Sequence, residues 1–314
     1  QKIFEQLLAK QVDRWQVAVR SLNSGFNLAG PDLGSPNIHL LKAIKPLLVV
    51  GQGVSPTEAG HIWHLVDRRL DLPLPMIDVQ HPGALDLTDY THLLIPDVEP
   101  KALPKAWYPL IKQWVNSGGV LITQKRSARW AEALFSVRSE DTDKAISEDS
   151  RLDKLVIEIT ANDDTSMEKL GRQPYGQYRR DSANRMVGGA IFSAKLDLTH
   201  PLAQGYKRET LPIFLNSLTQ LEPSKNAYST PLVLSSSSPL AGFASDFAKQ
   251  ELKGKPVLVV DKVGKGLVIK FAFNPNFRAF WRSTEGLYIN TLINDPMVQS
   301  TVLPVNPIVT TKVK

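Results

Sequence analysis

Residues 264–293 form one continuous strand–turn–helix pattern, which constrains the fold more than any other part of the sequence. After a glycine-flanked turn, an apolar run from Leu267 to Phe273 has the composition of a strand buried on both faces. A polar turn with Asn274 and Arg278 follows, and then a helical stretch. In α/β proteins such a turn lies at the carboxyl end of a strand, where ligands bind. The pattern therefore predicts an open α/β sheet.

The same alternation runs through the first half of the chain. An apolar run at residues 46–50 predicts a buried strand, and Ser55 and Pro56 predict the N-cap and first residue of a helix that reaches about Leu70. Further strands are expected at residues 76–79, 90–95 and 120–123, with helices at 105–117 and 128–135. Alternation of this kind predicts right-handed crossovers and a parallel sheet.

Composition divides the chain into five predicted regions. They are an N-terminal amphipathic helix (residues 3–22) with a linker (1–44 together), the first half of the α/β domain (45–136), an insertion (137–187), the second half (188–296) and a tail (297–314). Strands are expected in the second half at 190–196, 231–234, 256–260 and 267–273, the last two joined as a hairpin, with a last helix at 284–293. Weaker strand signals lie at 155–159 and 308–313.

The residue types exclude several functional classes. With no cysteine among 314 residues, disulfides, cysteine-type zinc sites and thiol nucleophiles are excluded. The net charge of +6 is spread along the chain, whereas nucleic-acid-binding proteins cluster their basic residues. No apolar run approaches the roughly 20 residues of a membrane span. The start at Gln1 resembles neither a signal peptide nor an initiator methionine, so we expect a fragment or a processed chain.

Two patterns near residue 55 have both a functional and a structural interpretation. Gly51-Gln52-Gly53 follows a strand, as in a dinucleotide-binding loop, but the third glycine of that fingerprint is replaced by Pro56. The alternative is a tight strand–helix turn. His61 and His64 have a spacing compatible with metal binding, and Glu58 precedes His61 by one turn. No further ligand is indicated, and the alternative is an ordinary helix face.

Candidate catalytic groups are sparse. A doubly wound hydrolase carries its nucleophile directly after a strand such as 120–123, but this chain has Gln124-Lys125-Arg126 there. Ser127 lacks glycine neighbours and an adjacent base, and His200 is distant in the sequence. Asp197 and His200 have a spacing that allows acid–base work, and the alternative is an Asp–Thr turn.

The turn after Phe273 is the strongest candidate for ligand binding. Asn274, Asn276 and Arg278, with Trp281, suit a carboxylate or a sugar, because arginine presents a forked donor. In the structural alternative, Arg278 pairs with a carboxylate such as Glu58 or Asp67. Across the chain we predict no catalytic and no metal-binding residue. The predicted ligand-binding residues lie at strand ends: Gly51, Gln52, Gly53, Glu58, Gln124, Asn274 and Arg278.

Several motifs occur in the order found in one known family. The chain resembles the glutamine-amidotransferase-like region that follows the catalytic domain in zinc carboxypeptidase proteins of the M14 class, over about residues 45–296. The resemblance rests on Val49-Val50-Gly51-Gln52-Gly53-Val54-Ser55-Pro56-Thr57-Glu58-Ala59-Gly60, Trp63-His64-Leu65-Val66-Asp67, Gly118-Gly119-Val120-Leu121-Ile122, Gly188-Gly189-Ala190-Ile191-Phe192, Leu196-Asp197-Leu198-Thr199-His200-Pro201-Leu202 and Asn274-Pro275-Asn276-Phe277-Arg278.

This resemblance implies a flavodoxin-like, class I amidotransferase-like three-layer α/β fold. It also implies a parent protein that removes C-terminal residues from peptides with zinc held by two histidines and a glutamate. None of that catalytic set maps onto this sequence, and the amidotransferase cysteine is missing as well. We therefore expect no cofactor in this region, zinc in the parent catalytic domain, and a periplasmic or extracellular location.

Three functional hypotheses follow. The first is a non-catalytic accessory domain that packs on the catalytic domain of the same parent chain or helps to present a peptide substrate. The second is a module that binds a small ligand, carbohydrate or peptide at the strand carboxyl ends. The third is a degenerate hydrolase that uses Ser127 or His200, which requires the two side chains to lie within hydrogen-bond reach.

Overall fold

The computed structural model describes residues 2–35, 38, 41, 43–136, 175–179, 183 and 187–300. Its contacts divide the chain into two compact units, residues 1–42 and 43–314. In the first unit, helix α1 (Lys2–Trp15) is shorter than the predicted 3–22, and none of its side chains is buried. Most of the predicted insertion and the strands expected at 155–159 and 308–313 lie outside the described residues.

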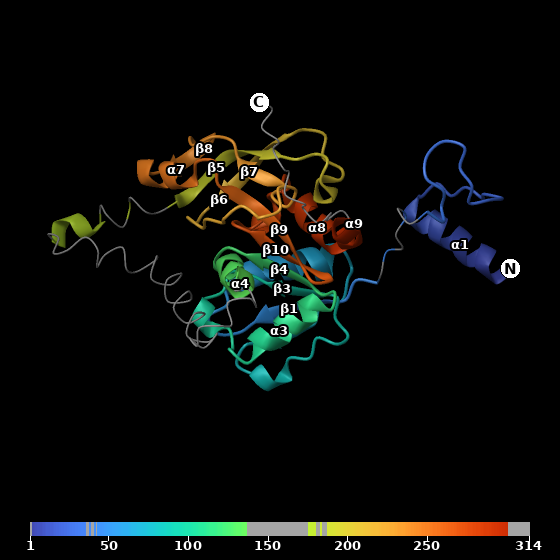
Figure 1. Cartoon of the computed structure of the whole chain (residues 1–314), viewed down its shortest axis with the longest axis horizontal. Helices are drawn as coiled ribbons and strands as arrows, with labels where there is room; N and C mark the ends of the chain where they lie inside the picture. Colours follow the sequence, from blue (N-terminus) through green and yellow to red (C-terminus); the bar gives the residue numbers. More distant parts are fainter. Residues whose placement is uncertain are drawn as a thin grey trace, which may run out of the picture. The chain divides into compact units, whose positions relative to one another are not determined.

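The second unit is built on one large mixed sheet, whose first half is parallel. Its strands are β2 (Met76–Asp78), β1 (Pro46–Val50), β3 (His92–Ile95), β4 (Val120–Gln124) and β10 (Gly266–Phe271), in that spatial order (Figure 1). Counted along the chain, these five strands have the order 2-1-3-4-5, which is that of flavodoxin-like sheets. The predicted parallel half is therefore confirmed.

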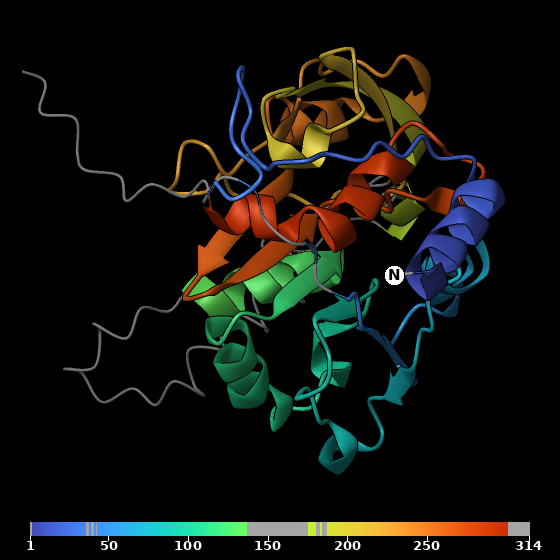
Figure 2. The ribbon, with the colours of Figure 1, turned by 90° about the vertical axis from the view of Figure 1, so that its right-hand side faces the viewer.

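The second half of the sheet is antiparallel, a direction that the sequence predicts only for the hairpin of its last two expected strands. Beyond β10 follow β9 (Pro256–Val263), β7 (Leu232–Leu234), β5 (Val187–Leu196) and β6 (Thr210–Leu215), and β8 (Ala241–Ala244) also pairs with β5. The predicted hairpin between β9 and β10 is confirmed, and these two strands join the halves (Figures 1 and 2). Strands β6 and β8 were not predicted.

Helices cover both faces of the parallel half. Helix α2 (Pro56–Trp63) continues as a π-helix at His64–Arg69, and α3 (Trp107–Asn116) and α4 (Arg126–Ser136) follow β3 and β4. The connection from β1 to β2 crosses the sheet in one direction, and the connection from β3 to β4 crosses it in the other. Because both crossovers are right-handed, α2 lies on one face of the sheet and α3 and α4 lie on the other. The described residues also contain α7 (Asp246–Leu252), α8 (Glu285–Ile293), α9 (Asp295–Ser300) and short 3₁₀ turns at Pro82–Ala84, Pro100–Ala102, Tyr175–Gln177, Pro201–Ala203 and Phe277–Ala279.

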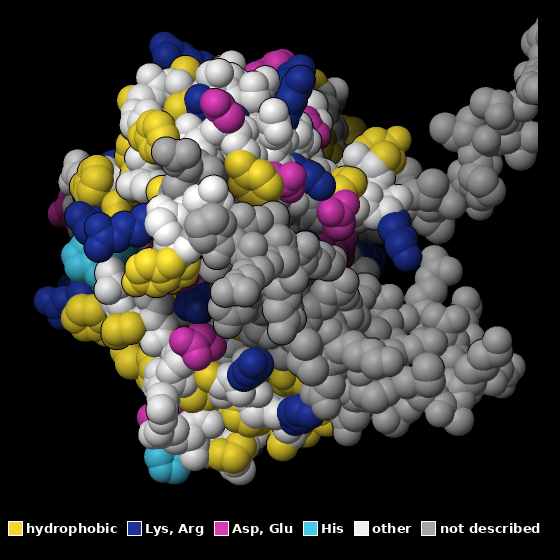
Figure 3. All heavy atoms as spheres, turned by 90° about the vertical axis from the view of Figure 1, so that its left-hand side faces the viewer, with side chains coloured by type: hydrophobic (Ala, Val, Ile, Leu, Met, Phe, Trp, Pro, Cys, Tyr) yellow, Lys and Arg dark blue, Asp and Glu magenta, His cyan; other side chains and the backbone are white. Residues whose placement is uncertain are grey.

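The predicted fold class is thus confirmed as an α/β three-layer sandwich of the flavodoxin-like, amidotransferase-like type. Its core is apolar and continuous across both halves, from Leu48 and Ile95 through Trp130 to Phe192 and Leu258. None of the described helices is long and apolar enough to cross a membrane. On the face drawn in Figure 3, basic side chains lie among acidic and apolar ones rather than in one stripe.

Candidate functional site

The four inner parallel strands end at one edge of the sheet. Strands β1, β3, β4 and β10 run in the same direction in direct neighbourhood, so their carboxyl ends and the turns after them converge. In open α/β sheets this edge is the usual ligand site. The structure therefore brings together turns that lie far apart in the sequence.

Lys125 occupies the turn directly after β4. Its backbone is left-handed, with φ of 52°, which non-glycine residues adopt rarely and which is typical of strained functional turns. Its N–H donates to the Phe271 carbonyl at 2.7 Å, which ties the turn to the neighbouring strand. Its side chain is buried, and its Nζ lies 2.5 Å from Oε1 of Glu58. Lys125 is not among the predicted site residues.

Glu58 is held in place by the start of α2. Ser55 caps the helix by accepting from the Glu58 N–H at 3.4 Å, and Pro56 begins it, as predicted. The other carboxylate oxygen of Glu58 accepts from Nδ2 of Asn274, in the turn after β10. A buried lysine and a buried glutamate, each costly alone, thus satisfy each other.

His61 and Asn276 complete this arrangement. Nδ2 of Asn274 lies 2.8 Å from Nδ1 of His61, and Nδ2 of Asn276 donates to the His61 carbonyl at 2.7 Å. Burial lowers the pKa of His61, against the opposing effect of the Glu58 carboxylate, so its ring is neutral at pH 7 and Nδ1 accepts from the amide. We call Glu58, His61, Lys125, Asn274 and Asn276 the corner network.

The remaining residues of the predicted site are not part of this network. Gln124 is fully buried, and its side-chain amide has no hydrogen-bond partner among the described residues. Arg278 is exposed, has a left-handed backbone and lies over the Phe277 ring. The expectation that Arg278 pairs with Glu58 is wrong, because Lys125 occupies that carboxylate.

The glycine-rich turn after β1 has a structural explanation. Gly51 and Gly53 both have positive φ, and a Cβ would lie 2.1 Å from the Asp78 carboxylate and 2.4 Å from Ala102, respectively. Gln52 between them is exposed and accepts from the Gln80 side chain. These contacts favour the tight-turn interpretation over a dinucleotide loop.

The nucleophile hypothesis does not meet its geometric requirement. The Ser127 hydroxyl lies 3.0 and 2.7 Å from the carbonyls of Ile95 and Gln124, and accepts from the Gln124 N–H. His200 uses Nδ1 to accept from the Leu202 N–H and cap a 3₁₀ turn. Each side chain has its own local partners, so the Ser127–His200 couple is wrong.

Two further alternatives can be assessed. Asp197 accepts from both the N–H and the hydroxyl of Thr199, which confirms the Asp–Thr turn. For a metal site at His61 and His64, no group of three or more His, Asp or Glu side chains suitable for a metal exists in the described part of the chain.

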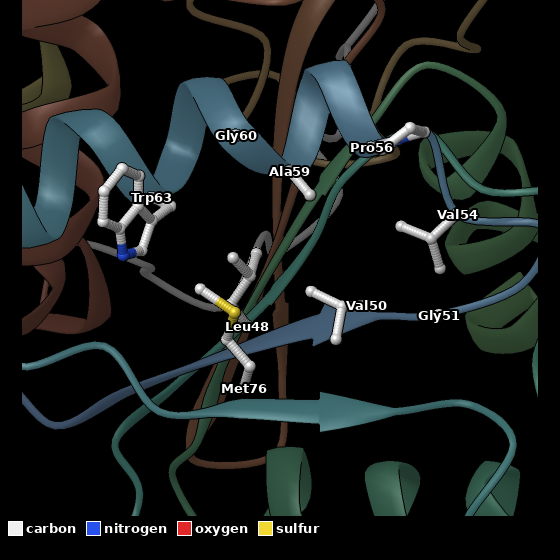
Figure 4. A pocket seen from close by; sticks show the side chains of 9 residues that line it. All are labelled: Leu48, Val50, Gly51, Val54, Pro56, Ala59, Gly60, Trp63 and Met76. Atoms are coloured by element: carbon white, nitrogen blue, oxygen red, sulfur yellow. The ribbon is translucent and has the colours of Figure 1, made fainter.

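An apolar cavity opens beside the corner network, at the carboxyl end of β1. It has a volume of about 310 Å³ and lies between α2 and strands β1 and β2 (Figure 4). No lining side chain carries an acid, a base or a nucleophile. The lining consists of Leu48, Val50, Gly51, Val54, Pro56, Ala59, Gly60, Trp63 and Met76. Of the predicted site residues, only Gly51 contributes to it.

Comparisons with known proteins give weak structural neighbours. No protein-family model matches the chain, and no curated protein sequence matches it. Among solved structures, a protein from Parabacteroides merdae described as ThuA-like aligns with 8% identity and a TM-score of 0.43, covering 84% of this chain and 93% of its own. A ThuA-like protein from Bacteroides uniformis aligns with 11% identity and a TM-score of 0.41, covering 85% of this chain and 94% of its own. A protein from Salmonella typhimurium that is described as cytoplasmic aligns with 12% identity and a TM-score of 0.42, covering 79% of this chain and 98% of its own.

The fold assignment rests on strand order rather than on these neighbours, whose TM-scores are all below 0.5. None of the three is described as a carboxypeptidase. The relationship to M14 carboxypeptidase proteins therefore stays a prediction from the sequence.

Proposed function

We propose that this chain is a non-catalytic binding module that accepts an apolar group in the cavity beside β1. The observation that carries the proposal is the contrast between two adjacent places at the strand ends. The corner network pairs its buried Lys125 and Glu58 with each other, so neither group is available to a substrate. The cavity has room for a ligand but is lined only by apolar side chains and glycine.

We further propose that the module works as an accessory domain in a zinc carboxypeptidase protein. Support comes from the sequence motifs quoted above and from the missing catalytic groups. In this proposal the zinc belongs to the catalytic domain of the parent chain, which acts in the periplasm or outside the cell. The accessory domain packs on that catalytic domain or holds part of its peptide substrate.

Titration with a small aromatic compound tests the cavity. Indole is expected to raise the melting temperature of the full chain, because a ligand that binds only the folded state adds about 2.7 kcal/mol at a hundredfold excess over its Kd. Trp63→Ala removes one wall of the cavity and is expected to abolish this shift. Trp15→Ala is the matched control, because Trp15 does not line the cavity. A shift that persists in Trp63→Ala would contradict the proposal.

The non-catalytic part has a separate test. The purified chain is expected to show no peptidase or glutaminase turnover above that of a Lys125→Met variant. Turnover that a single substitution abolishes would overturn this part and leave the indole result standing.

A further inference from the structure

Strand β2 presents an unpaired edge directly beside the cavity. It is the terminal strand in the order of the described sheet and pairs only with β1. The Leu48 N–H donates to the Pro75 carbonyl at 2.9 Å, and the Val79 N–H donates to the Val50 carbonyl at 3.0 Å. Backbone N–H and C=O groups alternate in direction along a strand. Those of residues 75, 77 and 79 therefore point to β1, and those of Met76 and Asp78 point away from the sheet edge.

The outward groups form a short hydrogen-bonding array. The Asp78 carbonyl already accepts from the His81 N–H at 3.0 Å, within a turn. Among the described residues no other group bonds to the N–H and C=O of Met76 or to the N–H of Asp78, so these three groups are available to another strand. Backbone donors and acceptors spaced in this way are complementary to an extended peptide, which is the basis of binding by strand addition.

The cavity lies where a side chain of such a peptide would point. Met76 is 49% exposed, and its side chain points from β2 towards α2, from which Trp63, 38% exposed, also lines the space (Figure 4). Directly opposed residues on neighbouring strands lie on the same face, with Cβ atoms about 5 Å apart. A residue paired with Met76 would therefore direct its side chain to the α2 face, beside the mouth of the cavity.

We infer that the β2 edge and this cavity together bind an extended peptide segment, with one apolar side chain of the peptide in the cavity. This inference rests on the proposed binding function and names its ligand class. The edge supplies backbone hydrogen bonds and the cavity supplies side-chain preference. The cavity has no charged lining group to pair with an acidic or basic side chain, so a leucine, methionine or aromatic side chain is preferred.

The test uses the full chain and a fluorescein-labelled peptide, Lys-Thr-Val-Leu-Val-Thr-Lys, followed by fluorescence anisotropy. Replacing the central leucine with serine is expected to raise Kd at least about tenfold, because the apolar contact is lost. In the antiparallel pairing that this peptide is expected to adopt, the residue opposite Met76 exchanges both backbone hydrogen bonds with it, so N-methyl-leucine keeps the side chain, removes the donor to the Met76 carbonyl and is expected to cause a similar loss. Equal binding of the N-methylated peptide would overturn the edge pairing.

Two chain variants separate the contributions. Asp78→Pro removes an outward N–H without touching the bonds to β1 or the lining of the cavity, at an edge strand where proline is tolerated, and is expected to weaken peptide binding while indole still binds. Trp63→Ala is expected to weaken the binding of both the peptide and indole, and Trp15→Ala is expected to leave the binding of both unchanged. If the wild-type chain binds indole but not the peptide, this inference is overturned and the proposed function stands. If it binds neither indole nor the peptide, the inference and the proposed function are both overturned. Dimerisation in sedimentation velocity that Asp78→Pro abolishes would assign the edge to a second copy of the chain and overturn the peptide as its ligand.

Discussion

At the scale of single residues, the most informative position is Lys125. It stands in the left-handed turn between β4 and α4, the place where related architectures strain the backbone to expose a reactive side chain. Here the side chain is turned inward to a carboxylate from α2. The strained backbone geometry is therefore retained in a structural role, joining the β4 turn to α2.

The pairing gives a direct mutational prediction. Lys125→Met is expected to lower the free energy of unfolding by about 3–5 kcal/mol, because the buried Glu58 carboxylate loses its cation. Adding Glu58→Gln is expected to recover part of that loss, with a coupling energy of about 0.5–3 kcal/mol in a double-mutant cycle measured by urea denaturation.

Lys249→Met is the matched control, since Lys249 pairs with the exposed Asp246 and its loss is expected to change stability by less than about 0.5 kcal/mol. Equal effects of the two lysine variants would show that the Glu58–Lys125 pair is not buried.

Sequence reasoning found part of this network and missed the rest for a physical reason. Glu58 and Asn274 were selected because they lie in turns at strand ends, and the structure brings them together. The sequence marks Lys125 only as part of Gln124-Lys125-Arg126, which stands where a hydrolase would have its nucleophile. Its contact with Glu58 spans 67 residues along the chain, so only the sheet order reveals the partner. The available signal was its place immediately after an apolar strand.

At the scale of elements, two glycines give opposite predictions for the same substitution. Gly60 lies inside α2, and a Cβ there meets nothing within 4 Å, so Gly60→Ala is expected to stabilise the fold by roughly 0.5–1 kcal/mol through helix propensity. At Gly266, the start of β10, a Cβ would lie 2.2 Å from the carbonyl oxygens of Gly119 and Val115. Gly266→Ala is expected to destabilise by about 1–3 kcal/mol. Thermal melting of both variants checks the pair, and a stabilising Gly266→Ala would contradict the packing at this strand.

Elements were predictable where burial or capping signals were strong. Strands β1, β4 and β10 are rich in apolar residues and almost wholly buried, and α2 has both its cap and its proline. The unpredicted strands carry residues that usually count against a strand, namely Pro212 within β6 and Gly242 within β8. Their stability comes from pairing with β5, which local sequence does not show.

At the scale of the whole second unit, local sequence reveals the direction of strand pairing only where a short turn or a single helix joins two strands. The buried strands β4 and β9 are similar apolar runs, yet β4 pairs in parallel with β10 and β9 pairs antiparallel to it. Strands β9 and β10 are joined by a hairpin, which reverses the chain, whereas α4 and strands β5 to β9 lie between β4 and β10 along the chain, so no local connection sets their parallel pairing. The alternation of residues 46–136 predicts the parallel half, and the pairing of β5 with β6, β7 and β8 has no comparable local signal.

Stability as a function of pH depends on both halves of this unit. Burial lowers the pKa of His92, on β3, and of His200, beside α8, to about 4 each. Two carboxylates lie near these rings. Asp295 is 3.9 Å from His92, and the charge of Asp197 raises the pKa of His200 against the larger effect of burial. The folded-state pKa lies below the unfolded value of about 6.5, so the unfolded chain binds more protons between these values. The stability that depends on these two neutral histidines is therefore fully present above about pH 6.5 and is lost as the pH falls towards about 4.

Each histidine is expected to contribute a loss of about 2 kcal/mol between pH 7 and pH 5, measured by urea denaturation at both values. His200→Asn keeps an acceptor for the Leu202 N–H and removes the titrating ring, so its stability should fall by about 2 kcal/mol less than that of the wild type. His81→Asn, at an exposed position, is the matched control and should follow the wild type. If His200→Asn and His81→Asn lose the same stability, the His200 ring is already charged in the folded state, and the burial that this fold imposes on it has been assigned incorrectly.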